Sequence, residues 1–486
     1  MNVADTMSRR SAERPEAIAI LEGERAITYR ALDDAVWRAA AWLAARGIAP
    51  GDVVGISLPS SALHLVVVYA LARLGAVQVP LAPGQAPALR QSLIDFFGVG
   101  AVVGLAGQPP QPGPALLAAD PGWLEPGAVP PARGLRARGD AAGWRFILSS
   151  GTTRAPKGIL YSHFQEAGFQ SRVHSTIGEA RQGRYLQLID MSYCYGLRLC
   201  MNALGHGATV VIAGTIAAGD FVEVLARQRI THMAAIPVHL QLVAPALAET
   251  PRRDLAIAEL TVSGAVMPEP LRQVIRRKLT PHLQVKFGAN EVGYMTAASP
   301  ELLSRCPDTI GTAVPDVEVE VVDDRGRPLP AGEIGLLRAR GRRFPSAYFR
   351  NPEATARAFR DGWFLPGDLV LRDAAGAFYF KGRADDQMNY DGVKIVPTDI
   401  EDALLQHPAV VEAAAFALPS DLHQDLPSAA VVLRRPVPVE ELLAFCRERL
   451  GVRRARRIVI LPALPRNAAG KILRRELARM AAETER

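Results

Sequence analysis

Apolar residues in the first part of the chain alternate between the spacings that distinguish helices from strands. The stretch 31–47, ALDDAVWRAAAWLAARG, has apolar residues at helical spacing and ends at a glycine. The stretch 52–58, DVVGISL, has the composition of a strand, and 61–75, SALHLVVVYALARLG, predicts a second helix. Helices alternate with strands where parallel strands must be joined by crossover connections, so an α/β fold is predicted.

Length and composition limit the domain count and the class of partner. A chain of 486 residues is too long for one ordinary core, so two or more domains are expected. The net charge of +7, from 56 basic and 49 acidic residues, is small for this length. It permits anionic ligands but does not indicate a nucleic-acid partner, which usually requires more basic charge on one face. An arginine-rich surface without a partner fits equally well.

The cysteines and the apolar segments indicate a reduced, cytoplasmic enzyme without a membrane span. Residues 1–20 lack the apolar core of a signal peptide. The most apolar stretch, 64–82, is interrupted by Arg73 and Gln78, which predicts a buried helix followed by a strand. No C-x-x-C spacing or histidine pair suggests a zinc site or a disulfide framework. The four cysteines are Cys194, Cys200, Cys306 and Cys446.

The pattern changes after about residue 310. The segment 317–324, VEVEVVDD, alternates strictly, which predicts an antiparallel strand with one wet face. The segments 332–341 and 376–383 are similar, so a β-rich module is expected at about 311–382. In the last hundred residues helical and strand patterns alternate again, as in a small α+β domain.

A polar loop in FILSSGTTRAPKGILYSH (146–163) has the groups that bind a polyphosphate. An apolar strand precedes it, and Ser162 with Gln165 has the form of a capping box, so the loop is expected between a strand and a helix. Hydroxyls, free backbone N–H groups and one ammonium suit phosphate binding. The loop is not a Walker A motif, because Lys157 precedes a glycine rather than Ser or Thr. Alone, it is equally compatible with a surface turn.

Four further segments carry groups suited to a nucleotide. KFGANE (286–291) places Glu291 after a strand and a glycine turn, as for a magnesium ligand. GWFLPGDL (362–369) places Asp368 in a turn, where a carboxylate accepts from ribose hydroxyls. The segment 381–401 begins KGRADD and joins a basic residue to two acids, and LPRNAAGKILRREL (464–477) presents Lys471 ahead of a helix. Each segment alone could be a turn or a solvated face. That interpretation does not explain all five segments occurring together in this order.

Together these motifs resemble those of the adenylate-forming superfamily, which includes acyl-CoA synthetases, peptide-synthetase adenylation domains and luciferases. SGTTRAPKG is similar to S-G-T-T-G-x-P-K-G, FGANE to Y-G-x-T-E and GWFLPGD to G-W-x-x-T-G-D. GRADD is similar to G-R-x-D-D, and PRNAAGK to P-R-x-x-x-G-K. The resemblance implies an N-terminal domain (1–384) of stacked α/β layers with a small β-barrel. A mobile C-terminal lid (385–486) would carry the catalytic lysine and turn about a hinge near Asp385.

The resemblance also implies a two-step reaction with ATP and Mg²⁺. A carboxylate attacks the α-phosphorus to give an acyl-adenylate and pyrophosphate, and a thiol then displaces AMP. The implied catalytic residues are Lys471, Glu291, Asn290 and Thr152, with Glu291 as the metal ligand. The implied nucleotide-binding residues are Ser149, Ser150, Gly151, Thr153, Lys157, Gly264, Ala265, Phe287, Gly288, Asp368 and Arg383. The implied substrate pocket contains Tyr193, Cys194, Gly196, Val238, Val266 and Ala289.

Several positions depart from the family pattern. Asn290 stands for threonine, Phe287 for tyrosine, Pro366 for threonine and Arg154 for the second glycine of the loop. An amide still donates to a phosphate, so activity with altered geometry is expected. The family's Phe-Asp pair, whose acid binds an α-amine, falls at Tyr193–Cys194. A neutral thiol does not pair with an ammonium, which favours an aliphatic or aryl acid without an α-amine.

The remaining alternatives concern the amine, the acceptor and catalysis itself. One alternative is a stand-alone adenylation enzyme that loads an amino acid, such as a β-amino acid, onto a carrier protein. Asp190 could then serve a differently placed amine, although it could equally have a turn or cap role. Only 15 residues follow Lys471, so CoA or the phosphopantetheine of a separate, acidic carrier protein is the expected acceptor. Either would be attracted to Arg453, Arg454, Arg456 and Arg457, which otherwise form a solvated face. A non-catalytic nucleotide-binding protein is the last alternative, but the presence of Lys157, Glu291, Asp368 and Lys471 argues against it.

Overall fold

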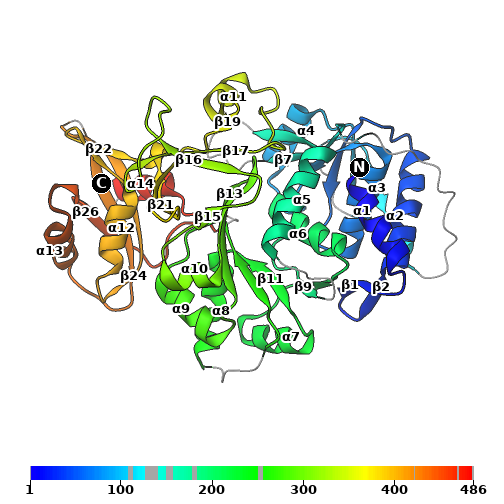
Figure 1. Ribbon diagram of the computed structural model, residues 1–486, viewed down its shortest axis with the longest axis horizontal. Coiled ribbons are helices and arrows are strands. Elements are labelled where there is room, and N and C mark those ends of the chain that lie inside the picture. Colours follow the sequence, from blue (N-terminus) through cyan, green and yellow to red (C-terminus); the bar gives the residue numbers. More distant parts are fainter. Residues whose placement is uncertain are drawn as a thin grey trace.

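The chain is a mixed α/β protein with a large N-terminal part and a smaller C-terminal part (Figure 1). The N-terminal helices lie at one end of the view and the C-terminal elements β22 to α14 at the other. The computed structural model describes residues 2–107, 113–125, 139, 141–148, 157–177, 183–249, 255–420, 422–467 and 470–483.

One sheet of the N-terminal part has the strand order β6-β5-β3-β4-β7-β8. Neighbours from β6 to β7 run parallel, and β8 pairs antiparallel with β7. The parallel strands confirm the α/β prediction. The bounds are β3 (Val53–Ser57), β4 (Val77–Pro80), β5 (Ala101–Leu105), β6 (Leu116–Ala119), β7 (Gly143–Leu148) and β8 (Gly158–Ser162).

A second, larger sheet has the order β15-β14-β13-β12-β11-β9-β10-β1-β2. The neighbouring strands in the run β1-β10-β9-β11-β12-β13 are parallel. The pairs at both edges of the sheet are antiparallel. The bounds are β1 (Ile18–Glu22), β2 (Arg25–Thr28), β9 (Arg184–Leu186), β10 (Thr209–Ile212), β11 (His232–Ala235), β12 (Glu259–Val262), β13 (Leu283–Ala289), β14 (Gly293–Ala298) and β15 (Thr312–Ala313).

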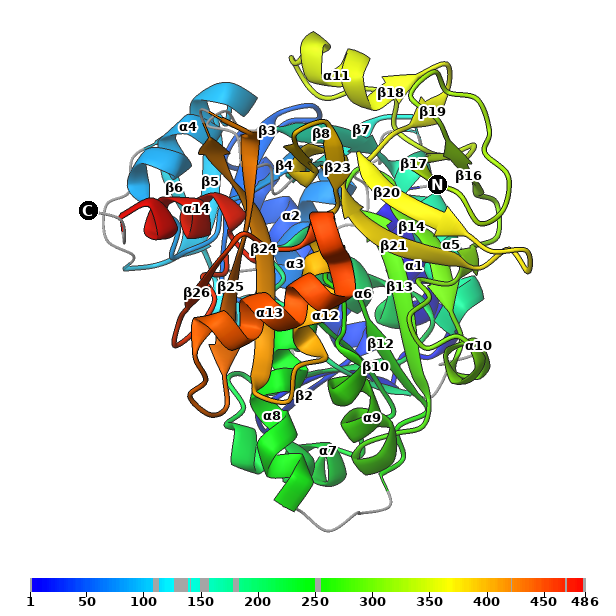
Figure 2. The ribbon, with the colours of Figure 1, turned by 90° about the vertical axis from the view of Figure 1, so that its left-hand side faces the viewer.

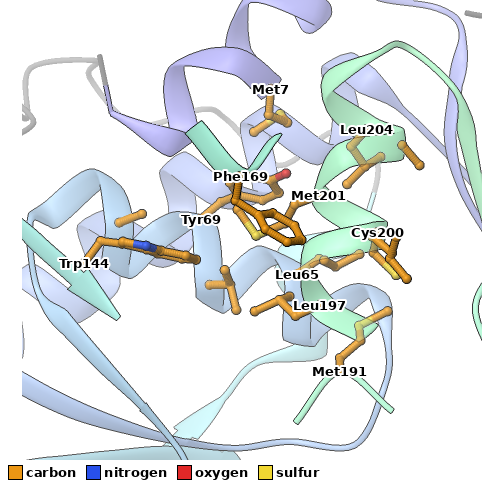
Figure 3. Packing of buried hydrophobic residues seen from close by; sticks show 14 of the residues in the cluster. Met7, Leu65, Tyr69, Trp144, Phe169, Met191, Leu197, Cys200, Met201 and Leu204 are labelled. Atoms are coloured by element: carbon orange, nitrogen blue, oxygen red, sulfur yellow. The ribbon is translucent and has the colours of Figure 1, made fainter. Parts of the chain in front are cut away.

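The helix α3 is buried along its whole length and packs against α1, α2, β3 and β4. It is apolar on every face, as expected for a helix enclosed by protein. Leu65 and Tyr69 of α3 share a cluster with Leu197 and Met201 of α6 (Figure 3). The N-terminal helices are α1 (Val3–Glu13), α2 (Tyr29–Ala44), α3 (Ala62–Leu74), α4 (Pro87–Phe97), η1 (Pro121–Leu124), α5 (His163–Ile177), α6 (Cys194–Gly205), η2 (Ala218–Asp220), α7 (Phe221–Arg227), α8 (Pro237–Glu249), α9 (Glu269–Lys278) and α10 (Pro300–Arg305).

A third sheet is antiparallel and occupies the region where the β-rich module was predicted. Along β16 the side chains alternate between exposed and more buried positions, which confirms the interpretation of 317–324. The bounds are β16 (Glu318–Val322), β17 (Ile334–Arg340), β18 (Phe359–Arg360), β19 (Trp363–Phe364), β20 (Asp368–Arg372) and β21 (Phe378–Arg383), with α11 at Pro352–Ala358.

The C-terminal elements form a fourth sheet with helices on both faces (Figure 2). Ala413 and Ala415 of β24 pack into a core with α12 and α13, whereas Ala414 and Phe416 pack with α14 on the other face. Successive side chains of a strand point to opposite faces, so one apolar strand serves both cores. The bounds are η3 (Ala384–Asp386), β22 (Met388–Tyr390), β23 (Val393–Ile395), α12 (Pro397–Leu405), β24 (Val410–Ser420), β25 (Gln424–Leu433), α13 (Val439–Leu450), η4 (Gly451–Arg453), β26 (Arg457–Ile460) and α14 (Arg474–Glu483).

The prediction for the segment after the polar loop was wrong. The polar loop after Leu148 leads into β8 and not directly into a helix, because Gly158–Ser162 pairs with β7. The capping box still opens α5, since Gln165 N donates to Ser162 Oγ and Ser162 N donates to Gln165 Oε1.

Arg73 and Gln78 are buried, as the interpretation of 64–82 requires. Arg73 lies over the Trp37 ring and pairs with Asp33 at 3.4 Å, so its charge is compensated inside the fold. All four cysteines are free, which agrees with the predicted absence of disulfides. Across the described ranges, no helix combines the length and the apolar character needed to cross a bilayer.

His64 in the first turn of α3 predicts a loss of stability in acid. Its ring is buried, and burial together with the charge of Arg145 lowers the pKa of His64 to about 4 from its usual 6.5. Between these values the unfolded chain binds a proton that the folded chain does not. As the pH falls from 6.5 to 4, this group should remove about 3 kcal/mol from the free energy of unfolding. Urea unfolding across this range should show a smaller decline in His64→Phe, and an equal decline would contradict the prediction.

Candidate active site

Glu291 lies in the turn between the antiparallel strands β13 and β14. Its carboxylate Oε1 accepts a hydrogen bond of 2.8 Å from Tyr348 Oη, and its carbonyl accepts one of 2.7 Å from Tyr161 Oη. Burial, and then the charge of Glu291, raise the pKa of Tyr348, so the phenol stays protonated and donates. The turn is therefore tied to β8 and to the segment before α11. Gly288, expected in the turn, is the next-to-last residue of β13 instead.

Asn290 contacts the residue that precedes the polar loop, and Lys157 is the last residue of that loop. Asn290 Nδ2 donates to the carbonyl of Leu148, the last residue of β7, at 3.1 Å. Lys157 directly precedes β8 and is half-buried. The other residues that were predicted to bind phosphate lie outside the described residues, as does Arg154: they are Ser149, Ser150, Gly151, Thr152 and Thr153.

Asp368 and Arg383 face one another across β20 and β21. Asp368 was predicted to lie in a turn, but it is the first residue of β20. The distance from Arg383 Nη1 to Asp368 Oδ1 is 2.7 Å. Burial raises the pKa of Asp368, while the charges of Arg383 and Lys471 lower it. The C-terminal Lys471 is therefore an electrostatic neighbour of this N-terminal pair.

A glycine turn presents Lys471 against the N-terminal part. Gly470 has φ +77°, its N–H donates to the carbonyl of Asn467, and Lys471 N donates to Asn467 Oδ1. A Cβ on Gly470 would lie 3.0 Å from Val238 Cγ1 of α8. Glycine permits both the positive φ and this close approach. The Lys471 residue is exposed, so its ammonium is accessible to a ligand.

Three predicted nucleotide-binding residues, Gly264, Ala265 and Phe287, and two predicted pocket residues, Val266 and Ala289, lie in β13 and in the loop after β12. Gly264, with φ +90°, follows β12, and its added Cβ would lie 3.1 Å from Ile236, which also approaches Gly470. Ala265 and Val266 are exposed. Phe287 is half-buried, and its ring centroid lies 6.0 Å from that of Phe380. Ala289 is half-buried at the end of β13.

The other three residues of the predicted substrate pocket besides Val238, Val266 and Ala289 lie at the start of α6. Tyr193 precedes the helix and is 45% exposed, and Cys194 is partly exposed. Burial raises the pKa of the Cys194 thiol to about 11, against the effect of Arg198. Gly196 is buried, and a Cβ there would lie 2.3 Å from the carbonyl oxygen of Ile189. The thiol is neutral at physiological pH, and no side chain larger than that of glycine fits at 196.

Beneath Cys194 lies a charged cluster that the motifs did not predict. Arg198 pairs with Glu166 at 2.8 Å, with both side chains almost fully buried. Arg145 of β7 is fully buried and donates to Gln78 Oε1 at 3.1 Å. An arginine inside the apolar run WRFIL was the available signal, since charged residues are seldom fully buried without a role or a partner.

The segment between the two parts of the protein contains Asp385, which is exposed in η3. Its neighbour Asp386 lies 3.8 Å from Arg474, which also pairs with Glu401 at 2.5 Å. Among the described residues, no group of three or more His, Cys, Asp or Glu is placed to hold a metal ion. A magnesium ion at Glu291 would therefore rely mainly on phosphate oxygens and water, which is the usual arrangement for Mg²⁺ with a nucleotide. One oriented carboxylate fits that arrangement.

Comparisons with known proteins find relatives that match most of this chain. The 2-succinylbenzoate–CoA ligase of Bacillus subtilis is 27% identical over 97% of this chain and 96% of its own length. Pyochelin synthase PchD of Pseudomonas aeruginosa is 30% identical, with 98% and 92% covered. The probable nonribosomal peptide synthetase CymA of Salinispora arenicola is 29% identical over 98% of this chain, which spans only 6% of that protein.

Several solved structures also superpose on this chain. The B. subtilis o-succinylbenzoate CoA synthetase, solved with ATP and a magnesium ion, superposes with a TM-score of 0.87 at 26% identity, covering 97% of this chain and 98% of that one. MatB of Rhodopseudomonas palustris has the same fold, with a TM-score of 0.89 at 22% identity over the whole of both chains. The family model described as AMP-binding enzyme matches residues 7–349, and the model of its C-terminal domain matches 399–471. The chain therefore belongs to the AMP-binding family of adenylate-forming enzymes.

Proposed function

We propose that the enzyme activates a carboxylic acid without an α-amine, using ATP and Mg²⁺, and transfers the acyl group to a thiol. The main support is that the charge of Lys471, although distant in sequence, acts on Asp368 of the Asp368–Arg383 pair, and that its glycine turn approaches Val238 of the N-terminal part. A cation there meets the charge that develops when a carboxylate attacks a phosphate. Preorganised charge of this kind is a large part of catalysis in phosphoryl-type transfers.

In the first step, each polar group has a role that follows from its surroundings. Glu291, oriented by Tyr348, would hold Mg²⁺ against the phosphates. Lys157 would add charge at the end of the phosphate loop, and Asn290 would donate to the α-phosphate. Asp368 would accept from the ribose hydroxyls while Arg383 fixes its position. Lys471 would contact both the carboxylate and the α-phosphate.

For the second step we propose a rotation of residues 385–486 about Asp385. Lys471 would leave, and the hairpin of β22 and β23 would approach the acyl-adenylate. Its tip is formed by Asp391 and Gly392, with φ +50° and +82°. The close approach of Gly470 to Val238, where an added Cβ would lie 3.0 Å away, supports an arrangement suited to the first step.

The proposed class of substrate acid follows from the neutral thiol at Cys194. An α-ammonium group needs a negative partner, and Cys194 does not supply one. Asp190, considered for a β-amino acid, accepts from Ser192 N at 2.7 Å, which favours a turn role. The alternative of a non-catalytic nucleotide-binding protein predicts ATP binding without turnover.

The test is acid-dependent exchange of pyrophosphate into ATP over a panel of aliphatic acids, aryl acids and amino acids. We expect exchange with acids that lack an α-amine. Exchange with α-amino acids alone would refute the proposed substrate class. ATP binding by calorimetry without exchange for any acid would favour the non-catalytic alternative. Relatives support the proposal, since the B. subtilis synthetase was solved with its acyl-adenylate OSB-AMP.

Glu291→Gln should raise the Mg²⁺ concentration that supports half-maximal exchange by about tenfold or more. The amide keeps the shape and the bond from Tyr348 but lacks the negative charge, and carboxylate ligands dominate Mg²⁺ affinity. Glu353→Gln removes a carboxylate from an exposed pair with Arg357 and serves as the control. The same Mg²⁺ dependence in both variants would show that Glu291 does not serve the metal.

The acceptor, CoA or the phosphopantetheine of an acidic carrier protein, is proposed to bind at the arginine cluster. Two of its four arginines already have contacts within the protein. Arg457 donates to the carbonyl of Ala481, and the Arg456 guanidinium lies 4.4 Å from the Tyr390 ring centroid. Arg453 is exposed in η4. Burial, and then the charges of Arg456 and Arg447, lower the pKa of Arg454. Like charges held this close favour a bound anion.

Reversing Arg453 and Arg454 to glutamate should sharply reduce acyl transfer to a carrier protein and leave pyrophosphate exchange intact. Added salt should weaken the wild-type transfer, because exposed charges are screened within about 10 Å at 0.1 M. If CoA is the acceptor, the variant should mainly raise the KM for CoA. Transfer that is indifferent to salt and to charge reversal would identify the cluster as a solvated face.

A further inference from the structure

Arg145 is a buried cation with one unpaired edge. It lies on β7 opposite Gln78 of β4, and its Nη1 donates to Gln78 Oε1 at 3.1 Å. Its Nε and Nη2 atoms are buried and have no hydrogen-bond partner among the residues that the structure describes. These two nitrogens form the side edge of the guanidinium, which matches the two oxygens of one carboxylate. Burial lowers the pKa of Arg145 only to about 10, so it is charged at neutral pH.

The nearby acid is already engaged by another cation. Glu166 Oε2 accepts from Arg198 Nε at 2.9 Å, and Glu166 Oε1 accepts from Gln170. The Arg198 guanidinium also lies 4.3 Å from the ring centroids of Tyr161 and Phe169. One carboxylate thus stands against two buried guanidinium groups. Buried charges are usually paired, so the uncompensated charge on Arg145 calls for an anion.

The cluster adjoins the proposed acyl pocket through Cys194. Cys194 and Arg198 are four residues apart on α6 and therefore lie on one face of it. The Cys194 thiol interacts electrostatically with Arg198, Glu166 and Arg145, and the residue is partly exposed beside Tyr193. The Arg145 guanidinium is therefore an electrostatic neighbour of a thiol at the edge of the proposed pocket.

We propose that the acid activated here carries a second carboxylate, which binds the Nε–Nη2 edge of Arg145. This inference rests on the proposed function and adds to it a class of substrate. Both nitrogens are buried in this structure, so binding of the second carboxylate requires neighbouring side chains to move. Arg145 would then determine specificity, while Arg198 and Glu166 compensate one another.

The test compares acids that differ only in the second charge. Pyrophosphate exchange is measured with glutarate and monomethyl glutarate, and with phthalate and monomethyl phthalate. In the wild type we expect the diacid of at least one pair to exceed its half-ester by about 100-fold in kcat/KM, since a charged hydrogen-bonding partner is lost. Arg145→Met should bring this ratio close to one.

A second variant keeps the proposal testable if Arg145→Met fails to fold. Cys194→Asp places a carboxylate beside Arg145, so it should occupy the cation, lower the diacid-to-half-ester ratio and raise the midpoint of urea unfolding. Leu89→Asp, at an exposed position of α4, adds the same charge elsewhere and should leave the ratio unchanged.

The outcomes separate this inference from the proposed function. Half-esters that match or exceed their diacids in the wild type would overturn the role of Arg145 while leaving acid activation in place. A diacid preference that persists in Cys194→Asp, and in Arg145→Met where that variant folds, would also overturn it. Absence of exchange with every acid would refute the proposed function and, with it, this inference.

Discussion

Lys471→Ala is expected to slow acid-dependent pyrophosphate exchange by about 10²–10³-fold, or about 3–4 kcal/mol in the barrier. The lysine lies close enough to influence the titration of the buried Asp368, and its turn packs on Val238. Its ammonium would therefore meet charge that develops only during attack on the α-phosphorus. Loss of such a contact lowers kcat more than it weakens ATP binding.

The second half-reaction separates a catalytic role from a structural one. Thioester formation from a supplied acyl-adenylate should be largely spared in Lys471→Ala, because the lysine is proposed to leave before that step. Lys278→Ala, on α9, serves as a control for loss of a lysine outside the candidate site. Equal loss of both half-reactions in Lys471→Ala would contradict the assigned role.

Glu166→Gln is expected to reduce the free energy of unfolding by about 3–5 kcal/mol. Glu166 is fully buried and is the carboxylate that compensates Arg198, with Arg145 also acting on the same cluster. The glutamine keeps the volume but removes the charge, which leaves two buried guanidinium groups without an anion. Urea unfolding at neutral pH measures the change.

An exposed ion pair provides the matched control. Glu318 and Arg340 pair at 2.6 Å on β16 and β17, with 62% and 47% of their side chains exposed. Glu318→Gln should change the unfolding free energy by less than about 1 kcal/mol, because solvent screens an exposed pair. Similar effects of the two substitutions would show that burial does not set the importance of the Glu166 pair.

Much of the fold could be predicted from the sequence because its signals are local. The apolar run of α3 requires enclosure on all sides, and the alternation along β16 fixes which side chains face the core. The glycine before Lys471 also marks a turn by itself, since its positive φ disfavours other residues. The five motifs in order then indicated the superfamily.

Other features depended on contacts between distant residues. β8 was missed because a short strand after a polar loop is stabilised by pairing with β7, which no local pattern records. Asp368 was expected in a turn, yet it begins β20 because its register partner is Arg383. The orientation of Glu291 by Tyr348 joins residues 57 positions apart.

The sequence by itself determined the residue types, the order of elements and the family, because propensities, turn glycines and motif spacing act over a few neighbouring residues. Only the tertiary structure decided which charges share a buried space. Arg145 and Arg198 look alike in the sequence, as single arginines within apolar segments. Folding places Arg198 on Glu166 and leaves one edge of Arg145 unpaired, because pairing depends on distance in space and not on separation along the chain.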